Sequence, residues 1–313
     1  PMTATERHAL VNIQARARFD STRTAYAVGA VIVLLGLATT PAIKTARKYS
    51  FDKYGAGRDK IITIDKSFHG RTMATLTATA QEAMHNYFFP FNEGFVYCGK
   101  DIEEIKKQEG VCAVMLEFIQ GEGGVIPQNK QFIAQVYDYC KKSDILFIAD
   151  EVQTGVGRTG KFLCSEYYGV HPDITTLAKG LGGGLPVGAM LVGEKCENVM
   201  GAGTHGSTFG GNPVVCAGGK YVLSRIDEKL LEEVAAKGEY IKSRLEGVKG
   251  VKSVSGLGLM LGIELDGKKA ADVVKECIAK GVIPLTAKDR VRLLPPLIIT
   301  MEQLARATDV LVE

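Results

Sequence analysis

The sequence predicts an α/β fold in which helices cover a mostly parallel sheet. Two observations support this. Four short segments have the continuous apolar character of strands that are buried on both faces: Lys60–Ile64, Val111–Glu117, Ile145–Asp150 and Ala189–Val192. Apolar residues recur at helical spacing in segments between and after them: Gln131–Lys142, Pro213–Ile226 and Leu230–Leu245. Alternation of strands with helices is typical of a parallel sheet.

A smaller α+β domain is predicted at the C-terminal end. After Gly250 the pattern changes to Val251–Leu265, a helix around Ala270–Lys280, and strands near Val282–Leu285 and Val291–Leu294. A chain of 313 residues is also long for one average domain. We therefore expect an N-terminal segment at 1–42, a large domain at 43–245 and a small domain at 246–313.

Composition and charge disfavour a nucleic-acid-binding protein. The net charge is +3, from 38 Lys+Arg and 35 Asp+Glu, without a long run of either sign, whereas nucleic-acid binders usually have a basic patch. The seven cysteines are scattered, with no C-x-x-C pair and no zinc-like spacing. We expect reduced thiols, a cytoplasmic location and no bound metal.

The apolar segment Ala25–Ala38 has two possible interpretations. It is too short to span a bilayer comfortably. It could be the core of a signal peptide, because small residues follow at Ala38 and Ala42, but the polar stretch before it is long for one. A buried core segment is favoured, and no membrane partner is expected.

Two titratable residues lie where a doubly wound sheet binds its ligand, at the carboxyl ends of strands. Asp150 ends a predicted strand, and Lys179 follows the short run Ile174–Ala178 and precedes a glycine-rich turn. Glycines leave backbone room for a bulky ligand bonded to the lysine. Burial would lower the pKa of the lysine toward the neutral amine that attacks an aldehyde. Taken singly, Asp150 could be a helix cap and Lys179 a solvated side chain.

A glycine-rich stretch, Gly155–Lys161, matches both G-x-G-x-x-G and the first seven positions of a P-loop. The next residue is Phe162, which cannot ligate Mg²⁺ as the Ser or Thr of a P-loop does. The dinucleotide motif needs a strand immediately before it, and Glu151–Thr154 intervenes. A glycine-rich active-site loop is therefore favoured over a nucleotide site.

Six ordered blocks carry a resemblance to a known family: Ser67–Thr72, Gln120–Gly124, Asp150–Gly155, Leu177–Gly184, His205–Pro213 and Arg292–Leu297. From about Ala42 to the C-terminus, the chain resembles the class III (subgroup II) aminotransferases that depend on pyridoxal 5′-phosphate (PLP), in particular those acting on acetylornithine. The resemblance implies PLP fold-type I, with PLP as cofactor.

The resemblance also assigns the cofactor residues. Lys179 is expected to form the Schiff base with PLP and to move the substrate proton. Asp150 is expected to keep the pyridine nitrogen protonated. Three side chains are expected to contact the ring: Phe68 and Val152 on its faces and Gln153 at its phenolic oxygen. Thr208 is expected to reach the phosphate of the neighbouring subunit's cofactor, which implies a homodimer.

Two arginines and a glutamate are expected to bind substrate. A guanidinium pairs with a carboxylate through two hydrogen bonds and fixes its orientation, which suits Arg71 and Arg292. Glu122 is expected to neutralise Arg292 while acetylornithine is bound and to swing away for glutamate. The implied reaction transfers the δ-amine of N-acetylornithine to 2-oxoglutarate, giving N-acetylglutamate semialdehyde and glutamate in arginine biosynthesis.

Other interpretations stay open. Ornithine, succinylornithine or 4-aminobutyrate would use the same chemistry, and a catalytically inactive PLP-fold protein is the alternative from another class. The chain also departs from the family pattern. Phe118 stands where the family usually has proline, and the residues before Ala42 do not align with the family's phosphate-binding loop, which lies at a helix N-terminus. No site residue is assigned there.

Overall fold

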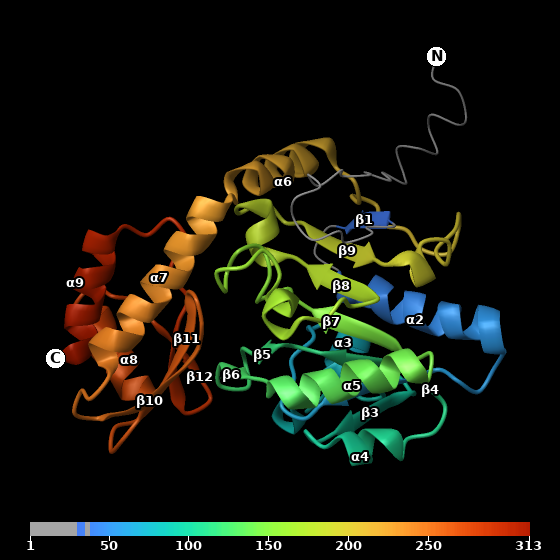
Figure 1. The fold of residues 1–313 in the computed structure, drawn as a ribbon, viewed down its shortest axis with the longest axis horizontal. Helices are drawn as coiled ribbons and strands as arrows, with labels where there is room; N and C mark the ends of the chain where they lie inside the picture. The colour runs from blue at the N-terminus through green and yellow to red at the C-terminus, as the bar shows by residue number, and fades with distance from the viewer. Residues whose placement is uncertain (1–29, 35–37) are drawn as a thin grey trace. The chain divides into compact units, whose positions relative to one another are not determined.

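A computed structural model describes residues 30–34 and 38–313, which divide into two compact units. The first comprises the described residues up to Glu117 together with Asn129–Gln153 and Ser165–Ser224. The second comprises Phe118–Gln128, Thr154–Cys164 and Arg225–Glu313. Each unit contains its own sheet (Figure 1). The domain limits expected from the sequence stay a prediction.

Within the described residues, the first unit contains a seven-stranded sheet in the order β1-β9-β8-β7-β4-β2-β3. The strands that pair in parallel are β2 (Lys60–Ile64), β3 (Phe95–Cys98), β4 (Val111–Leu116), β7 (Leu146–Asp150) and β8 (Ile174–Leu177). β9 (Gly188–Val192) and β1 (Ala30–Leu34) are added in antiparallel orientation. The predicted mostly parallel sheet is confirmed.

Helices cover both faces of this sheet. On one face α2 (Thr39–Tyr54) packs its buried residues, such as Ile43 and Ala46, in a cluster with Leu146 and Ile148 of β7. Side chains alternate across a strand, so Phe147 points to the other face, where its ring meets Tyr137 of α5 (Lys130–Lys142) at 5.6 Å. The other helices that begin in this unit are α3 (Met73–Ala78), α4 (Ile102–Lys106) and α6 (Pro213–Arg225).

The apolar segment Ala25–Ala38 is only partly described. Its residues 30–34 form β1, which pairs with β9 at the edge of the sheet, and Ala38 is buried. Residues 25–29 and 35–37 lie outside the described residues. Over the described part of the chain, no helix is both long and apolar enough to cross a membrane.

The second unit is an antiparallel sheet covered by helices, which agrees with the predicted α+β character of this part of the chain. Its strand order is β10 (Val251–Leu257), β11 (Met260–Leu265), β13 (Arg290–Leu293) and β12 (Leu285–Ala287). α7 (Glu228–Leu245), α8 (Ala270–Ala279) and α9 (Met301–Val312) share an apolar core with it. A short hairpin, β5 (Ile119–Gln120) with β6 (Ile126–Pro127), also belongs to this unit. β12 starts later than predicted, after Pro284, because proline has no N–H to donate to a strand ladder.

All seven cysteines lie in the described part of the chain, none of them forms a disulfide, and six of them are buried. Burial raises the pKa of Cys112 and of Cys196 to about 12. Among the described residues, no group of His, Cys, Asp and Glu side chains could hold a metal ion.

Asp144 connects α2 to the start of β7. Its carboxylate accepts hydrogen bonds from the Tyr49 hydroxyl at 3.0 Å, from Lys53 Nζ at 2.7 Å and from the Tyr54 hydroxyl. Burial raises the pKa of Asp144, but these hydrogen bonds outweigh burial and hold the pKa below its ordinary value of 3.8. The carboxylate form therefore stabilises the first unit.

Replacing this carboxylate should cost stability in a pH-dependent way. Asp144→Asn keeps a side chain that tolerates the observed φ of 51° but removes the charge, so we expect a loss of about 1 kcal/mol at pH 7. The folded-state pKa is depressed, so the difference from wild type should persist above about pH 4 and shrink below it. Urea unfolding at several pH values measures this. Asp138→Asn, on the exposed side of α5, is the control; an equal loss there would contradict the prediction.

Candidate active site

The buried carboxylate of Asp150 lies at the carboxyl end of β7. Its Oδ1 accepts hydrogen bonds from the Thr176 hydroxyl at 3.0 Å and from the N–H of Val152 at 3.2 Å. Its Oδ2 accepts one from Nδ1 of His69 at 2.8 Å. Asp150 and Thr176 are register partners on the parallel strands β7 and β8, which places both at one edge of the sheet. Three donors offset the cost of removing this carboxylate from water.

His69 is a site residue to which the sequence assigned no role. It lies in the block Ser67–Thr72, in the loop after β2, and it is 81 positions from Asp150. The carboxylate can only accept, so the hydrogen lies on Nδ1 of His69. Nε2 is buried and has no hydrogen-bond partner among the described residues. The resemblance of the block Ser67–Thr72 to the family indicated that this loop belongs to the site, but the sequence did not indicate which of its residues contacts Asp150.

Lys179 follows β8 and begins the 3₁₀ turn Lys179–Gly182. Its φ is 47°, in the left-handed region that few residues other than glycine adopt, and such strain is commonest at functional sites. The Lys179 side chain is exposed. The glycines that follow have no side chains that could cover it.

The predicted ring-contact residues lie beside Asp150 in sequence or on the loop that carries His69. Phe68 is half-buried, and its N–H donates to Glu117 Oε2 at 2.9 Å. Val152 contacts Asp150 through its N–H. Oε1 of Gln153 is buried and has no partner in the part of the chain that the structure describes. This leaves unsatisfied polar atoms on Gln153 and His69.

Arg71 and Thr208 are both exposed. The guanidinium of Arg71 lies over the Phe68 ring, 5.3 Å from its centroid. Thr208 lies in the turn where the N–H of Gly210 donates to the carbonyl of Ser207. The predicted contact of Thr208 with a neighbouring subunit stays a prediction.

Arg292 and Glu122 are in contact within the second unit. Arg292, on β13, donates from Nη1 to Glu122 Oε1 at 2.6 Å, and the two side chains are 10% and 30% exposed. Over the described residues, Nε of Arg292 is buried without a hydrogen-bond partner. The guanidinium therefore has one carboxylate partner and an unused donor.

The loop Gly155–Gly160 is anchored inside the second unit. Nη1 of Arg158 donates to the carbonyls of Leu259 at 3.0 Å and Pro295 at 2.5 Å, and burial lowers the pKa of Arg158 to about 10. A Cβ on Gly157 would lie 3.2–3.3 Å from three apolar side chains: Ile226, Leu231 and Leu297. Close packing therefore favours a residue without a side chain at Gly157. An active-site role for the loop stays a prediction.

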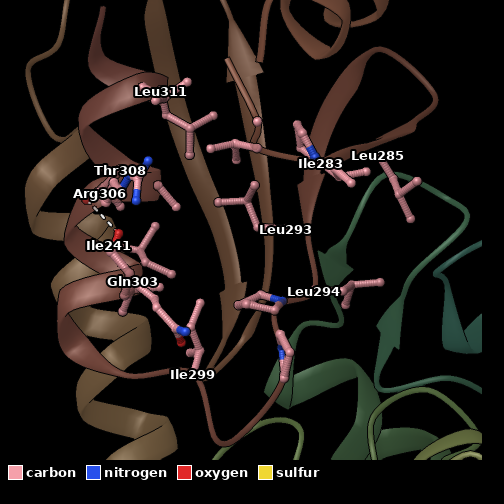
Figure 2. Close-up of a pocket in the computed structure, with 18 of the residues that line it drawn as sticks. Ile241, Ile283, Leu285, Leu293, Leu294, Ile299, Gln303, Arg306, Thr308 and Leu311 are labelled. Atoms are coloured by element: carbon pink, nitrogen blue, oxygen red, sulfur yellow. Dashed lines mark hydrogen bonds between the residues drawn. The ribbon is translucent and has the colours of Figure 1, made fainter. Parts of the chain in front are cut away.

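An open cavity of about 510 Å³ also lies in the second unit, beside β13 and α9 (Figure 2). Its lining is mainly apolar and includes Ile283, Leu293 and Leu294, together with Arg292. None of the predicted cofactor residues lines it, so it is not assigned to the cofactor.

The fold and these residues define a class of protein. Residues 36–313 match the family Aminotransferase class-III, and the chain belongs to this family of PLP-dependent enzymes. The acetylornithine aminotransferase of Haemophilus ducreyi is 48% identical over 281 residues, which is 88% of this chain and 72% of that protein. The predicted family, fold type, cofactor and aminotransferase activity are confirmed.

Two solved structures show the same fold. The ornithine aminotransferase of Toxoplasma gondii ME49 superposes with a TM-score of 0.86 at 31% identity, over 92% of this chain and 72% of that one. The N-acetylornithine aminotransferase of Stenotrophomonas maltophilia K279a gives a TM-score of 0.78 at 30% identity, over 100% of this chain and 79% of that one.

The residues of the first unit fit PLP. Asp150 offers a buried carboxylate to a protonated ring nitrogen, and Lys179 offers an amine to the aldehyde. The unsatisfied atoms of Gln153 and His69 leave polar capacity for a ligand. When bound, PLP supplies the electron sink that transamination requires.

The hydrogen bonds to Asp150 predict a face-specific effect of substitutions in β8. Thr176→Val removes one donor to a buried carboxylate and should lower the free energy of unfolding by about 1–3 kcal/mol. Thr175→Val is the matched control, since Thr175 is also buried but points to the opposite face of the sheet. Urea unfolding of both variants checks this. Similar losses at the two positions would show that the Asp150 contact is not the cause.

Proposed function

We propose that this chain transfers the δ-amine of N-acetylornithine to 2-oxoglutarate, which yields N-acetylglutamate semialdehyde and glutamate. The observation that carries the proposal is the contact between Arg292 and Glu122. An enzyme that alternates between one-carboxylate and two-carboxylate substrates needs a cation that can be neutralised in one half-reaction and exposed in the other. The acetylornithine aminotransferase of H. ducreyi, at 48% identity, supports the same substrate.

Lys179 would act as the acid–base group. Its amine would take the proton from the substrate carbon that bears the reacting amine and would deliver it to C4′ of PLP, since a positioned amine can act first as a base and then as an acid. Asp150 would hold a proton on the cofactor nitrogen, while His69 and Thr176 keep its carboxylate oriented. Phe68 and Val152 would enclose the ring, and Gln153 would bind its phenolic oxygen.

Substrate carboxylates would be bound by the two arginines. Arg71 would take the carboxylate far from the reacting amine in either substrate, because a guanidinium pairs with a carboxylate in a fixed plane. Arg292 would take the α-carboxylate of glutamate. With N-acetylornithine that carboxylate is absent, and Glu122 would then neutralise Arg292, since a desolvated unpaired guanidinium is costly.

A homodimer in which Thr208 reaches the cofactor phosphate of the neighbouring subunit belongs to this proposal. The proposal also includes a cytoplasmic location and a role in arginine biosynthesis. The free thiols support a reducing compartment. Ornithine is the second candidate donor, because the T. gondii structure at 31% identity is an ornithine aminotransferase. Comparing the half-reactions with acetylornithine, ornithine, succinylornithine and 4-aminobutyrate separates these donors.

Lys179→Ala should abolish turnover while the fold is retained, since no other group in the proposal both takes the proton from the substrate carbon and delivers it to the cofactor. Borohydride treatment of the PLP-loaded wild type, followed by peptide mapping, should place the pyridoxyl group on Lys179. Lys141→Ala, which removes an exposed lysine in the last turn of α5, is the control and should keep activity. Label on a different lysine would refute the assignment.

Glu122→Ala should separate the two half-reactions. Without the carboxylate, the N-acetylornithine half-reaction should slow about tenfold to a hundredfold, because Arg292 loses a charged hydrogen bond. The glutamate half-reaction should hold steady or improve. Stopped-flow spectroscopy measures each reaction alone. Glu276→Ala, whose carboxylate pairs with Lys268 on the surface of the same unit, is the control. Equal losses in both half-reactions would mean that Glu122 only supports its hairpin.

A further inference from the structure

The hairpin that carries Glu122 has a strained backbone. In the turn between β5 and β6, the N–H groups of Gly124 and Val125 both approach the carbonyl of Gly121 at 3.3 Å. Val125 has φ 56° and a fully buried side chain. A β-branched residue rarely adopts a positive φ, and such a conformation persists only where the surroundings hold it.

Ser255, on β10, holds this turn. Its hydroxyl donates to the carbonyl of Val125 at 2.7 Å, a shorter contact than its 3.3 Å approach to the carbonyl of Gly262. The Ser255 oxygen accepts a hydrogen bond from Nη1 of Arg290 at 2.8 Å. Nη2 of Arg290 is in turn bound to Glu264 Oε2 at 2.7 Å. Arg290 thus binds the same hydroxyl oxygen, and the shorter distance favours the Val125 carbonyl as the acceptor of the hydroxyl hydrogen.

The sheet places this contact in the same row as Arg292. Ser255 is the register partner of Gly262 on β11, and Gly262 is the register partner of Arg292 on β13. Register partners share a face of the sheet. A Cβ on Gly262 would lie 2.8 Å from Cβ of Val125, so a glycine here lets the hairpin lie against the sheet. Arg290 precedes Arg292 by two residues and shares its face.

We propose that Ser255 and Arg290 form a latch that fixes the hairpin with Glu122 facing Arg292, and that this latch sets the preference for donors without a second carboxylate. The inference rests on the proposed function. When the latch opens, Val125 can leave its strained conformation and Glu122 moves with the turn. Arg292 is then available to a dicarboxylate. Ser255 is a positioning residue, since it acts through Glu122.

Three variants test the latch in the PLP-loaded protein. Ser255→Ala removes the hydroxyl, and Ser255→Thr retains it. Ser243→Ala removes a serine hydroxyl on α7 that donates to the Tyr240 carbonyl. Stopped-flow measurement should show that Ser255→Ala slows the N-acetylornithine half-reaction about three- to tenfold and changes the glutamate half-reaction less than about twofold. Ser255→Thr should restore most of the loss, and Ser243→Ala should resemble wild type.

Calorimetry on the cofactor-free protein gives a readout that does not depend on turnover. In Ser255→Ala, the affinity for 2-oxoglutarate relative to that for N-acetylornithine should rise about three- to tenfold, the factor expected for the slowing of the N-acetylornithine half-reaction. An unchanged ratio, or equal slowing of both half-reactions, would overturn the latch. A wild-type protein that performs neither half-reaction would overturn the proposed function instead, and the affinity ratio would still decide on the latch.

Discussion

The burial of the Asp150 carboxylate is the constraint on which the first unit depends. A charge removed from water needs hydrogen-bond donors, and here they come from three segments: the loop after β2, the strand β8 and the residue that follows β7 by two positions. The donors from His69 and Thr176 depend on how the strands are arranged, whereas the N–H of Val152 is local in the chain. With β8 beside β7 in the observed register, Thr176 meets Asp150 and the chain then continues directly into Lys179. The pairing of β7 with β8 therefore brings together both the buried carboxylate with its donor and the strand that leads into Lys179.

In the second unit, the buried charged group Arg292 has fewer partners than Asp150 has in the first. Among the described residues, Asp150 has three hydrogen-bond donors, whereas the guanidinium of Arg292 is paired with one carboxylate, that of Glu122 on a hairpin turn. In the described structure its Nε has no partner. A group with many rigid partners is held in one state, while a group with one partner on a strained turn can exchange it. This contrast fits the proposed function, in which Asp150 keeps one arrangement and Arg292 alternates between Glu122 and a substrate carboxylate.

Sequence patterns predicted the buried strands closely, because burial on both faces produces an uninterrupted apolar run. β2 has its predicted bounds, and β4 and β7 differ from theirs by one residue at one end. β3 was not predicted, since it is not an uninterrupted buried run: Cys98 is buried, but Tyr97 is exposed. The pairing of His69 with Asp150 could not be predicted without a family alignment, because tertiary folding alone brings the two together. The conformation of Val125 contradicts local preference, which is typical of positions that the tertiary structure overrides.

The distribution of the cysteines has a practical consequence. Cys140 belongs to the first unit and Cys277 to the second, and both are buried. Burial also raises the pKa of each thiol, so the reactive thiolate is scarce as long as the native packing holds. Alkylation of either cysteine thus requires its surroundings to open. The alkylation rate of Cys140 therefore reports how often the first unit opens, and the alkylation rate of Cys277 reports the same for the second unit.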